Sequence, residues 1–121
     1  MQTIFLSALL LILIDSIYLY SIKNIFTKQI STIQGSPLQL NMYGAVACYV
    51  FLVFGLNYFI LNANKGIMDA FILGIVIYGV YETTNLALFK KWSINVAILD
   101  TIWGGILFAL TTFIIQKINA K

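Results

Sequence analysis

Three acidic residues lie inside long apolar runs of this sequence, where carboxyl groups are unusual. They are Asp15, Glu82 and Asp100. An ionised carboxylate in hydrocarbon costs several kcal/mol unless it is protonated, paired or facing a water-filled cavity. Three such groups therefore predict one of two things. Either they form polar contacts that hold helices together, or they form a site that holds a proton, a cation or a cationic head group.

The positions of the three acids within their runs predict that they share a depth. Asp15 and Glu82 lie about two helical turns before the end of their runs, and Asp100 lies about two turns into its own. At 1.5 Å per residue, each carboxyl group is expected roughly 10 Å below the same membrane face. We therefore expect the acids to meet in one layer of a helix bundle.

Side chains that can donate hydrogen bonds accompany each acid at helical spacing. Each lies three or four residues from an acid and so shares its helix face; the set is Tyr18, Tyr78, Asn85 and Trp103. Because clustered carboxylates repel and no basic residue lies inside the runs, we expect at least one acid to be neutral at pH 7. We also expect at least one short carboxyl-to-polar contact between helices. The fourth acid, Asp69, falls in the first turn of its run, where the helix dipole favours a carboxylate, and is left out of the site.

The composition indicates that the solvent of this chain is lipid. Hydrophobic residues make up 61% of the 121 residues and charged residues 9%, whereas a soluble domain carries about 25% charged residues. The length suits a single domain covering residues 1–121. We therefore expect an integral, multi-pass membrane protein.

The apolar runs predict four membrane spans joined by short turns. The expected spans are residues 3–22, 38–61, 67–88 and 93–115, and an amphipathic, interfacial segment is expected at 23–34. Short turns make neighbouring spans antiparallel, so the predicted fold is an all-α, antiparallel four-helix bundle with both termini on one side. Gly44, Cys48 and Gly55 fall near one face of the second span, which allows a close helix contact there.

The residue inventory argues against most catalytic chemistry. The chain has no His, and Cys48 is its single cysteine, which excludes serine–histidine and cysteine–histidine catalysis and leaves zinc almost without ligands. We assign no catalytic residue, metal or cofactor, and the sequence leans away from an enzyme. The net charge of +3 forms no patch suited to nucleic acid. Membrane lipids are the expected partners, and a homo-oligomer is an alternative to a monomer.

Several of these residues resemble the pattern of a known family. Three segments show the resemblance most clearly: residues 81–88 (Tyr-Glu-Thr-Thr-Asn-Leu-Ala-Leu), Lys91-Trp92, and residues 100–104 (Asp-Thr-Ile-Trp-Gly). Two further parts of the sequence are also similar to the family, Asp15 with Tyr18 and Lys28-Gln29-Ile30. Together they resemble the small membrane proteins called "domain of unknown function 2177". The resemblance implies four spans and a shared polar layer, and it implies no activity. Glu82 stands where the family is expected to carry Asp more often.

Three functions are compatible with the sequence. The first is proton- or cation-linked transport or binding, with Asp15, Glu82 and Asp100 holding the proton or cation. The second is a structural or partner-binding membrane protein whose acids join helices by hydrogen bonds. The third is a lipid-modifying activity, for which no phosphate-binding loop, metal-ligand cluster or nucleophile–base pair is visible in the sequence.

Overall fold

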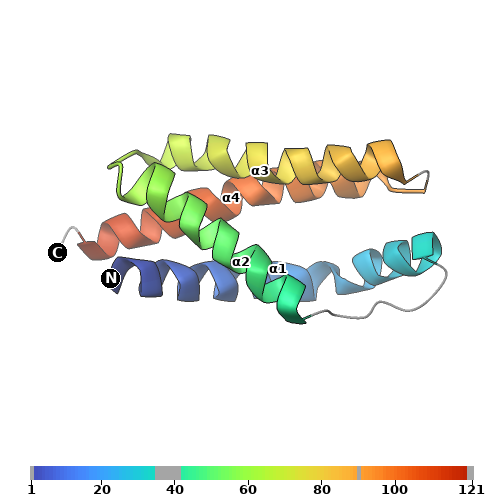
Figure 1. Ribbon diagram of the computed structural model, residues 1–121, viewed down its shortest axis with the longest axis horizontal. Helices are drawn as coiled ribbons and strands as arrows, with labels where there is room; N and C mark the ends of the chain where they lie inside the picture. Colours follow the sequence, from blue (N-terminus) through green and yellow to red (C-terminus); the bar gives the residue numbers. More distant parts are fainter. Residues whose placement is uncertain (1, 35–41, 90, 120–121) are drawn as a thin grey trace.

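The computed structural model describes residues 2–34, 42–89 and 91–119, which form helices joined by turns (Figure 1). The elements are α1 (Gln2–Gln34), α2 (Met42–Leu56), a π-helical turn η1 (Asn57–Leu61) that continues α2, α3 (Ile67–Leu88) and α4 (Ile94–Asn119). Four stretches are long and apolar enough to cross a membrane: Thr3–Ile25, Met42–Leu61, Ile67–Leu88 and Ile94–Asn119. The predicted all-α, four-span architecture is confirmed.

The helices form a bundle in which α4 is central. Figure 1 shows α1 and α3 running one way along the long axis, α4 running the other way, and α2 crossing α1 obliquely, with both chain ends at the same end of the bundle. The most extensive pairing joins α3 to α4, followed by α1 with α4, and then α1 with α2. Of the four candidate spans, α4 is the most buried. Helices α1 and α3 therefore both pack against α4.

The helices depart from the expected spans after residue 22 and after residue 115. Residues 23–34 are helical, as expected, but they continue α1 without a break. Residues 38–41 of the expected second span lie outside the described residues. The last helix runs to Asn119, beyond the expected end at 115. The amide of Gln116 donates to the backbone oxygen of Lys65 at 3.1 Å, which ties the end of α4 to the turn between η1 and α3.

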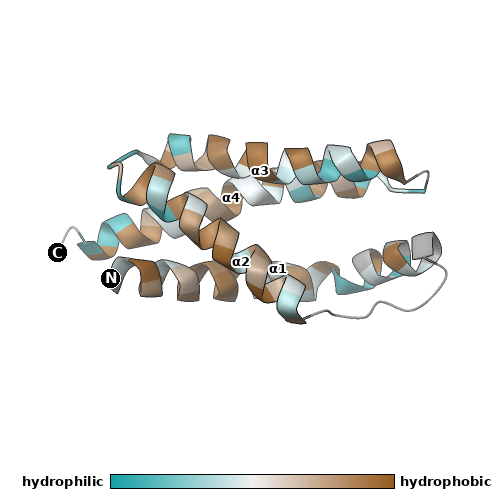
Figure 2. Ribbon diagram, in the orientation of Figure 1, coloured by the Kyte–Doolittle hydropathy of each residue, from teal (hydrophilic) through white to brown (hydrophobic). Residues whose placement is uncertain are grey.

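Large apolar side chains cover the outside of the bundle. Phe5 is 82% exposed, Phe51 74% and Met68 68%, and Figure 2 shows hydrophobic colouring along most of the helices, with hydrophilic colouring at the turns and at the end of α4. A soluble surface rarely exposes so much contiguous apolar area, so these faces suit lipid. The small interior draws on all four helices and consists of Leu11, Leu52, Leu56, Ile60, Ala70, Leu107 and Phe108.

Glycines bring α3 and α4 into direct backbone contact. A Cβ atom on Gly74 would collide with the backbone oxygen of Gly104 and lie 2.9 Å from the Cα of Gly105. A Cβ atom on Gly55 would meet nothing within 4 Å. The close contact that the small residues of the second span allow is therefore not made at Gly55, and α3 with α4 is the pair that packs through glycines.

Candidate functional site: a buried carboxyl layer

All three acids inside the spans point into the bundle. Asp15 of α1 is 6% exposed, Asp100 of α4 is 8% exposed, and Glu82 of α3 is fully buried. Because lipid-facing carboxyl groups would be largely exposed, the expectation that these residues face the interior is confirmed. Asp69, by contrast, is exposed in the first turn of α3.

Asp15 accepts hydrogen bonds from two other helices. The hydroxyl of Tyr49 on α2 donates to Asp15 Oδ2 at 2.6 Å, and the indole Nε1 of Trp103 on α4 donates to Asp15 Oδ1 at 2.9 Å. Each carboxyl oxygen of Asp15 therefore has its own donor. These bonds confirm the expected short carboxyl-to-polar contact between helices.

Tyr18 and Trp103 connect Asp15 to Asp100. Their rings stack with centroids 4.5 Å apart and planes inclined by 4°. The hydroxyl of Tyr18 donates to Asp100 Oδ1 at 3.3 Å, while Trp103 donates to Asp15. Two acids on different helices are thus joined through one pair of stacked aromatic rings.

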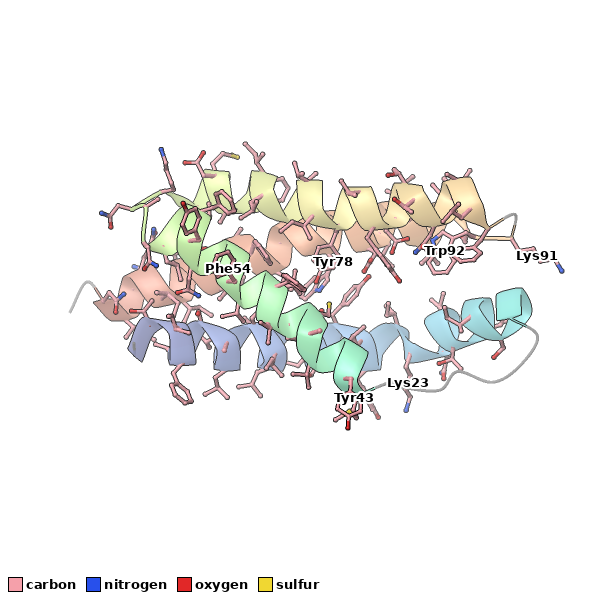
Figure 3. All side chains as sticks on the ribbon, in the orientation of Figure 1. Lys23, Tyr43, Phe54, Tyr78, Lys91 and Trp92 are labelled. Atoms are coloured by element: carbon pink, nitrogen blue, oxygen red, sulfur yellow. The ribbon has the colours of Figure 1, made fainter. Side chains whose placement is uncertain are left out.

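Glu82 is the most enclosed of the acids. Its Oε1 accepts a hydrogen bond from the indole Nε1 of Trp92 at 2.7 Å, and Trp92 comes from the turn between α3 and α4. Figure 3 shows the Trp92 ring directed into the bundle, whereas Lys91 beside it points away. The second oxygen, Oε2, is buried and finds no hydrogen-bond donor in the described part of the chain.

The carboxyl groups of Glu82 and Asp100 lie within hydrogen-bonding reach of one another. Two ionised carboxylates have no proton to share, so a hydrogen bond between them requires that at least one be protonated. Glu82 Oε2 is also buried without a hydrogen-bond donor in the described chain. The geometry is therefore suited to holding one proton between α3 and α4.

Tyr78 and Asn85, the other expected supporting residues, have different surroundings. A Cβ atom on Gly104 would collide with the Tyr78 side chain, so Tyr78 packs directly against that glycine. Within the described residues the Tyr78 hydroxyl makes no hydrogen bond to the three acids. Asn85 is 8% exposed, and its side-chain Nδ2 is buried with no hydrogen-bond partner among those residues. Asn85 thus lies buried on α3, one turn from Glu82.

Two donors were missing from the predicted site, Tyr49 and Trp92. Tyr49 is the polar residue that α2 contributes to the layer, and its bond to Asp15 is the shortest contact there. Trp92 follows Lys91 in a charged turn, a setting typical of an aromatic residue at the membrane interface. Its 6% exposure shows that it folds back into the bundle. The signal available in the sequence was the position of Tyr49, which lies in the second span at the depth expected for the three acids.

The layer has no arrangement suited to a metal ion. Within residues 2–34, 42–89 and 91–119, no group of three or more His, Cys, Asp or Glu side chains could hold one.

Lys23, the basic residue that follows the first expected span, does not point toward the carboxyl layer. Figure 3 shows Lys23 directed away from the bundle, and its Nζ lies 4.6 Å from the centroid of the Tyr20 ring. The chemistry that the described geometry offers is hydrogen bonding and proton binding by carboxyl groups.

The fold and the buried carboxyl layer define a small, four-span integral membrane protein. The model of the family described as "Predicted membrane protein (DUF2177)" matches residues 1–116. The chain belongs to this family, as the motifs around Glu82 and Asp100 suggested. Comparison with curated proteins and with solved structures gives no match.

Proposed function

We propose that this protein binds and releases a proton within the membrane and couples that event to the movement or binding of a second molecule. The observation that carries the proposal is the pairing of Glu82 with Asp100, in which Glu82 Oε2 is buried without a donor. A carboxyl pair inside a bundle holds one proton readily because like charges at short distance disfavour a doubly ionised state. Ionisable groups inside membrane spans mark proton and ion pathways in many transporters.

The hydrogen bonds around the pair provide a way for its protonation to affect other helices. Asp100 accepts from Tyr18 of α1, and the Tyr18 ring stacks on Trp103, which donates to Asp15. Asp15 in turn accepts from Tyr49 of α2. A proton leaving the Glu82–Asp100 pair would change the charge on Asp100 and alter this chain of contacts. Such a change would favour a different packing of α1 and α2 against α4.

Proton flux into vesicles tests the proposal. The protein is reconstituted into liposomes loaded with a pH-sensitive dye, and flux is followed with a panel of candidate cargo molecules. We expect cargo-dependent flux that is lost in Asp100→Asn and in Glu82→Gln. Asp69→Asn, which changes an exposed acid on α3, is the matched control and should leave flux unchanged. Undiminished flux in Asp100→Asn, or no flux with any member of a broad panel, would exclude the carrier.

A second candidate function is structural, and a specific observation favours it. Each of the three acids accepts a hydrogen bond from an aromatic side chain outside its own helix. Such bonds between membrane helices stabilise a bundle by about 0.6 kcal/mol on average and up to about 2 kcal/mol. In this case the acids join helices so that the bundle can organise lipid or a partner.

The two candidates differ in what happens when an acid becomes an amide. Under the structural function, Asp15→Asn and Asp100→Asn change the free energy of unfolding by about 1–2 kcal/mol and leave the cellular function intact. Under the proton-coupled function, both lose activity even when the folded population is restored by lower temperature. Unfolding in mixed micelles, measured beside an activity or complementation assay, separates the two.

A further inference from the structure

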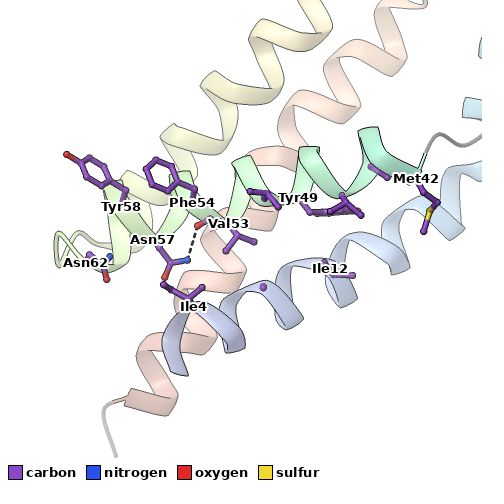
Figure 4. A pocket seen from close by; sticks show the side chains of 13 residues that line it. Ile4, Ile12, Met42, Tyr49, Val53, Phe54, Asn57, Tyr58 and Asn62 are labelled. Atoms are coloured by element: carbon purple, nitrogen blue, oxygen red, sulfur yellow. Dashed lines mark hydrogen bonds between the residues drawn. The ribbon is translucent and has the colours of Figure 1, made fainter. Parts of the chain in front are cut away.

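An apolar groove lies between α1 and α2, away from the Glu82–Asp100 pair. Its volume is about 650 Å³, within the range of roughly 300–1,000 Å³ that is usual for small-molecule sites. Figure 4 shows α1 forming one side and α2 with η1 the other. Most of the lining is aliphatic or aromatic, and the polar members are Tyr49, Asn57, Tyr58 and Asn62. Three of these four lie together at the η1 end, so the groove is polar at one end and apolar along the rest.

Asn57 lines the groove and carries a buried side-chain acceptor without a hydrogen-bond partner in the described chain. It is 4% exposed, and its Nδ2 donates to Ser7 Oγ at 2.9 Å and to the backbone oxygen of Val53 at 2.8 Å. Because Ser7 Oγ donates to the backbone oxygen of Ile4, it can accept from Asn57, and the orientation of the amide follows from these contacts. The remaining oxygen, Oδ1, is buried with no hydrogen-bond partner in the described chain. A buried acceptor of this kind is costly unless a donor reaches it.

The backbone around Asn57 is itself unusual. Residues 57–61 form a π-helical turn, in which the backbone N–H of Asn62 donates to the oxygen of Asn57 at 2.7 Å. This π-helical turn forms the last five residues of the second candidate span. Here the turn places Asn57, Tyr58 and Asn62 at the same end of the groove. It is also where the second candidate span ends, at Leu61, close to the expected level of lipid head groups.

We propose that this groove binds a single-chain membrane lipid whose polar end carries a hydroxyl or N–H donor. The donor bonds to Asn57 Oδ1 at the η1 end, and the hydrocarbon chain lies between α1 and α2 toward Ile12 and Met42. Lipid is the occupant because both walls belong to candidate membrane spans, and because a polar end near the span terminus followed by an apolar channel matches an amphiphile. The proposal does not require the proton-coupled function, since neither Glu82 nor Asp100 lines the groove. Tyr49, which donates to Asp15, is the residue that the groove shares with the carboxyl layer.

Photolabelling in vesicles tests the groove with a defined probe. The probe is a long-chain alcohol with a diazirine in its chain, and its methyl ether, which has the same chain and no donor, is the comparison. Both are incorporated into phosphatidylcholine proteoliposomes and the labelled peptides are mapped. We expect the alcohol to label the Ile4–Ile12 and Met42–Asn62 segments, and the ether to label them several-fold less. Asn57→Leu should abolish the difference between the two probes.

A matched pair of variants controls for folding and for general lipid contact. Val46 lines the groove and is 58% exposed, whereas Val80 lies on α3 outside it and is 63% exposed. Val46→Trp should fill the groove and reduce labelling by the alcohol several-fold, and Val80→Trp should leave it unchanged. Equal labelling in both variants, equal labelling by alcohol and ether in the unmodified protein, or uniform labelling of all four helices would overturn the proposal. So would cross-links between two copies across this groove, since the occupant would then be a second chain.

Discussion

Tyr18 on α1 and Trp103 on α4 form a reciprocal pair of hydrogen bonds between their helices. Each residue donates to the acid that lies three residues before the other residue. Tyr18 donates to Asp100, and Trp103 donates to Asp15, while the two rings stack at 4.5 Å. The same three-residue spacing, repeated on two antiparallel helices, makes the contact reciprocal. Moving either helix along its axis by one turn would break both bonds at once. This exchange therefore sets the register of α1 against α4.

Removing the hydroxyl of Tyr49 should cost more stability than removing that of Tyr18. Tyr49 bonds to Asp15 at 2.6 Å, whereas Tyr18 bonds to Asp100 at 3.3 Å. We expect Tyr49→Phe to lower the free energy of unfolding by about 1 kcal/mol, and Tyr18→Phe to lower it less, because the ring stack remains. Equilibrium unfolding in mixed micelles measures both. Tyr43→Phe, at a position 90% exposed, is the neutral control. A larger loss of unfolding free energy in Tyr18→Phe than in Tyr49→Phe would contradict the order of the two hydrogen-bond distances.

Trp92 should stabilise the bundle through Glu82. Trp92→Phe removes the donor to Glu82 Oε1 and leaves two buried carboxyl oxygens without a donor from an aromatic side chain. The expected loss of unfolding free energy is about 1–3 kcal/mol. In a Glu82→Leu background the same substitution should cost clearly less, because the two residues act as a pair. A double-mutant cycle measures the coupling, and strictly additive losses would show that Trp92 acts by packing alone.

A methyl group at Gly74 should disrupt the contact between α3 and α4. The added Cβ would collide with the backbone of Gly104 and Gly105, which cannot move as a side chain could, so Gly74→Ala should destabilise by about 1–3 kcal/mol. Gly55→Ala is the matched control. Its Cβ meets nothing within 4 Å, and the better helix propensity of Ala should make it neutral or stabilising by up to about 1 kcal/mol. Thermal unfolding in one detergent ranks the two variants, and equal effects would contradict the close crossing.

At least one acid of the buried layer should be neutral at pH 7. Three carboxyl groups lie in one polar layer, and Glu82 and Asp100 approach each other directly. Infrared difference spectra across a pH titration should show a protonated-carboxyl stretch at neutral pH that shifts or disappears in Glu82→Gln or Asp100→Asn. Asp69→Asn should leave this band unchanged, because Asp69 is exposed. Spectra in which all three acids are ionised at pH 7 would rule out a shared proton.

Much of this fold follows from the sequence because lipid imposes simple rules on a chain. Backbone groups must be satisfied within each segment, so long apolar runs become helices, and the third span was predicted at its observed bounds, Ile67–Leu88. An acid inside such a run must turn inward, as Asp15, Glu82 and Asp100 do. Helical spacing also places Tyr18 on the face of Asp15 and Trp103 on the face of Asp100, so both could be named as donors.

The partner of each donor was decided by the tertiary structure. Periodicity assigns residues to a face of one helix, but it contains no information on how far neighbouring helices are rotated or shifted against each other. Those shifts give Asp15 its bonds to Tyr49 and Trp103, fold Trp92 back onto Glu82, and bring Glu82 beside Asp100. They also place the close glycine contact between α3 and α4 and leave Gly55 free of one. Rotation and shift depend on how all side chains at the crossings pack together, and that packing exists only in the assembled bundle.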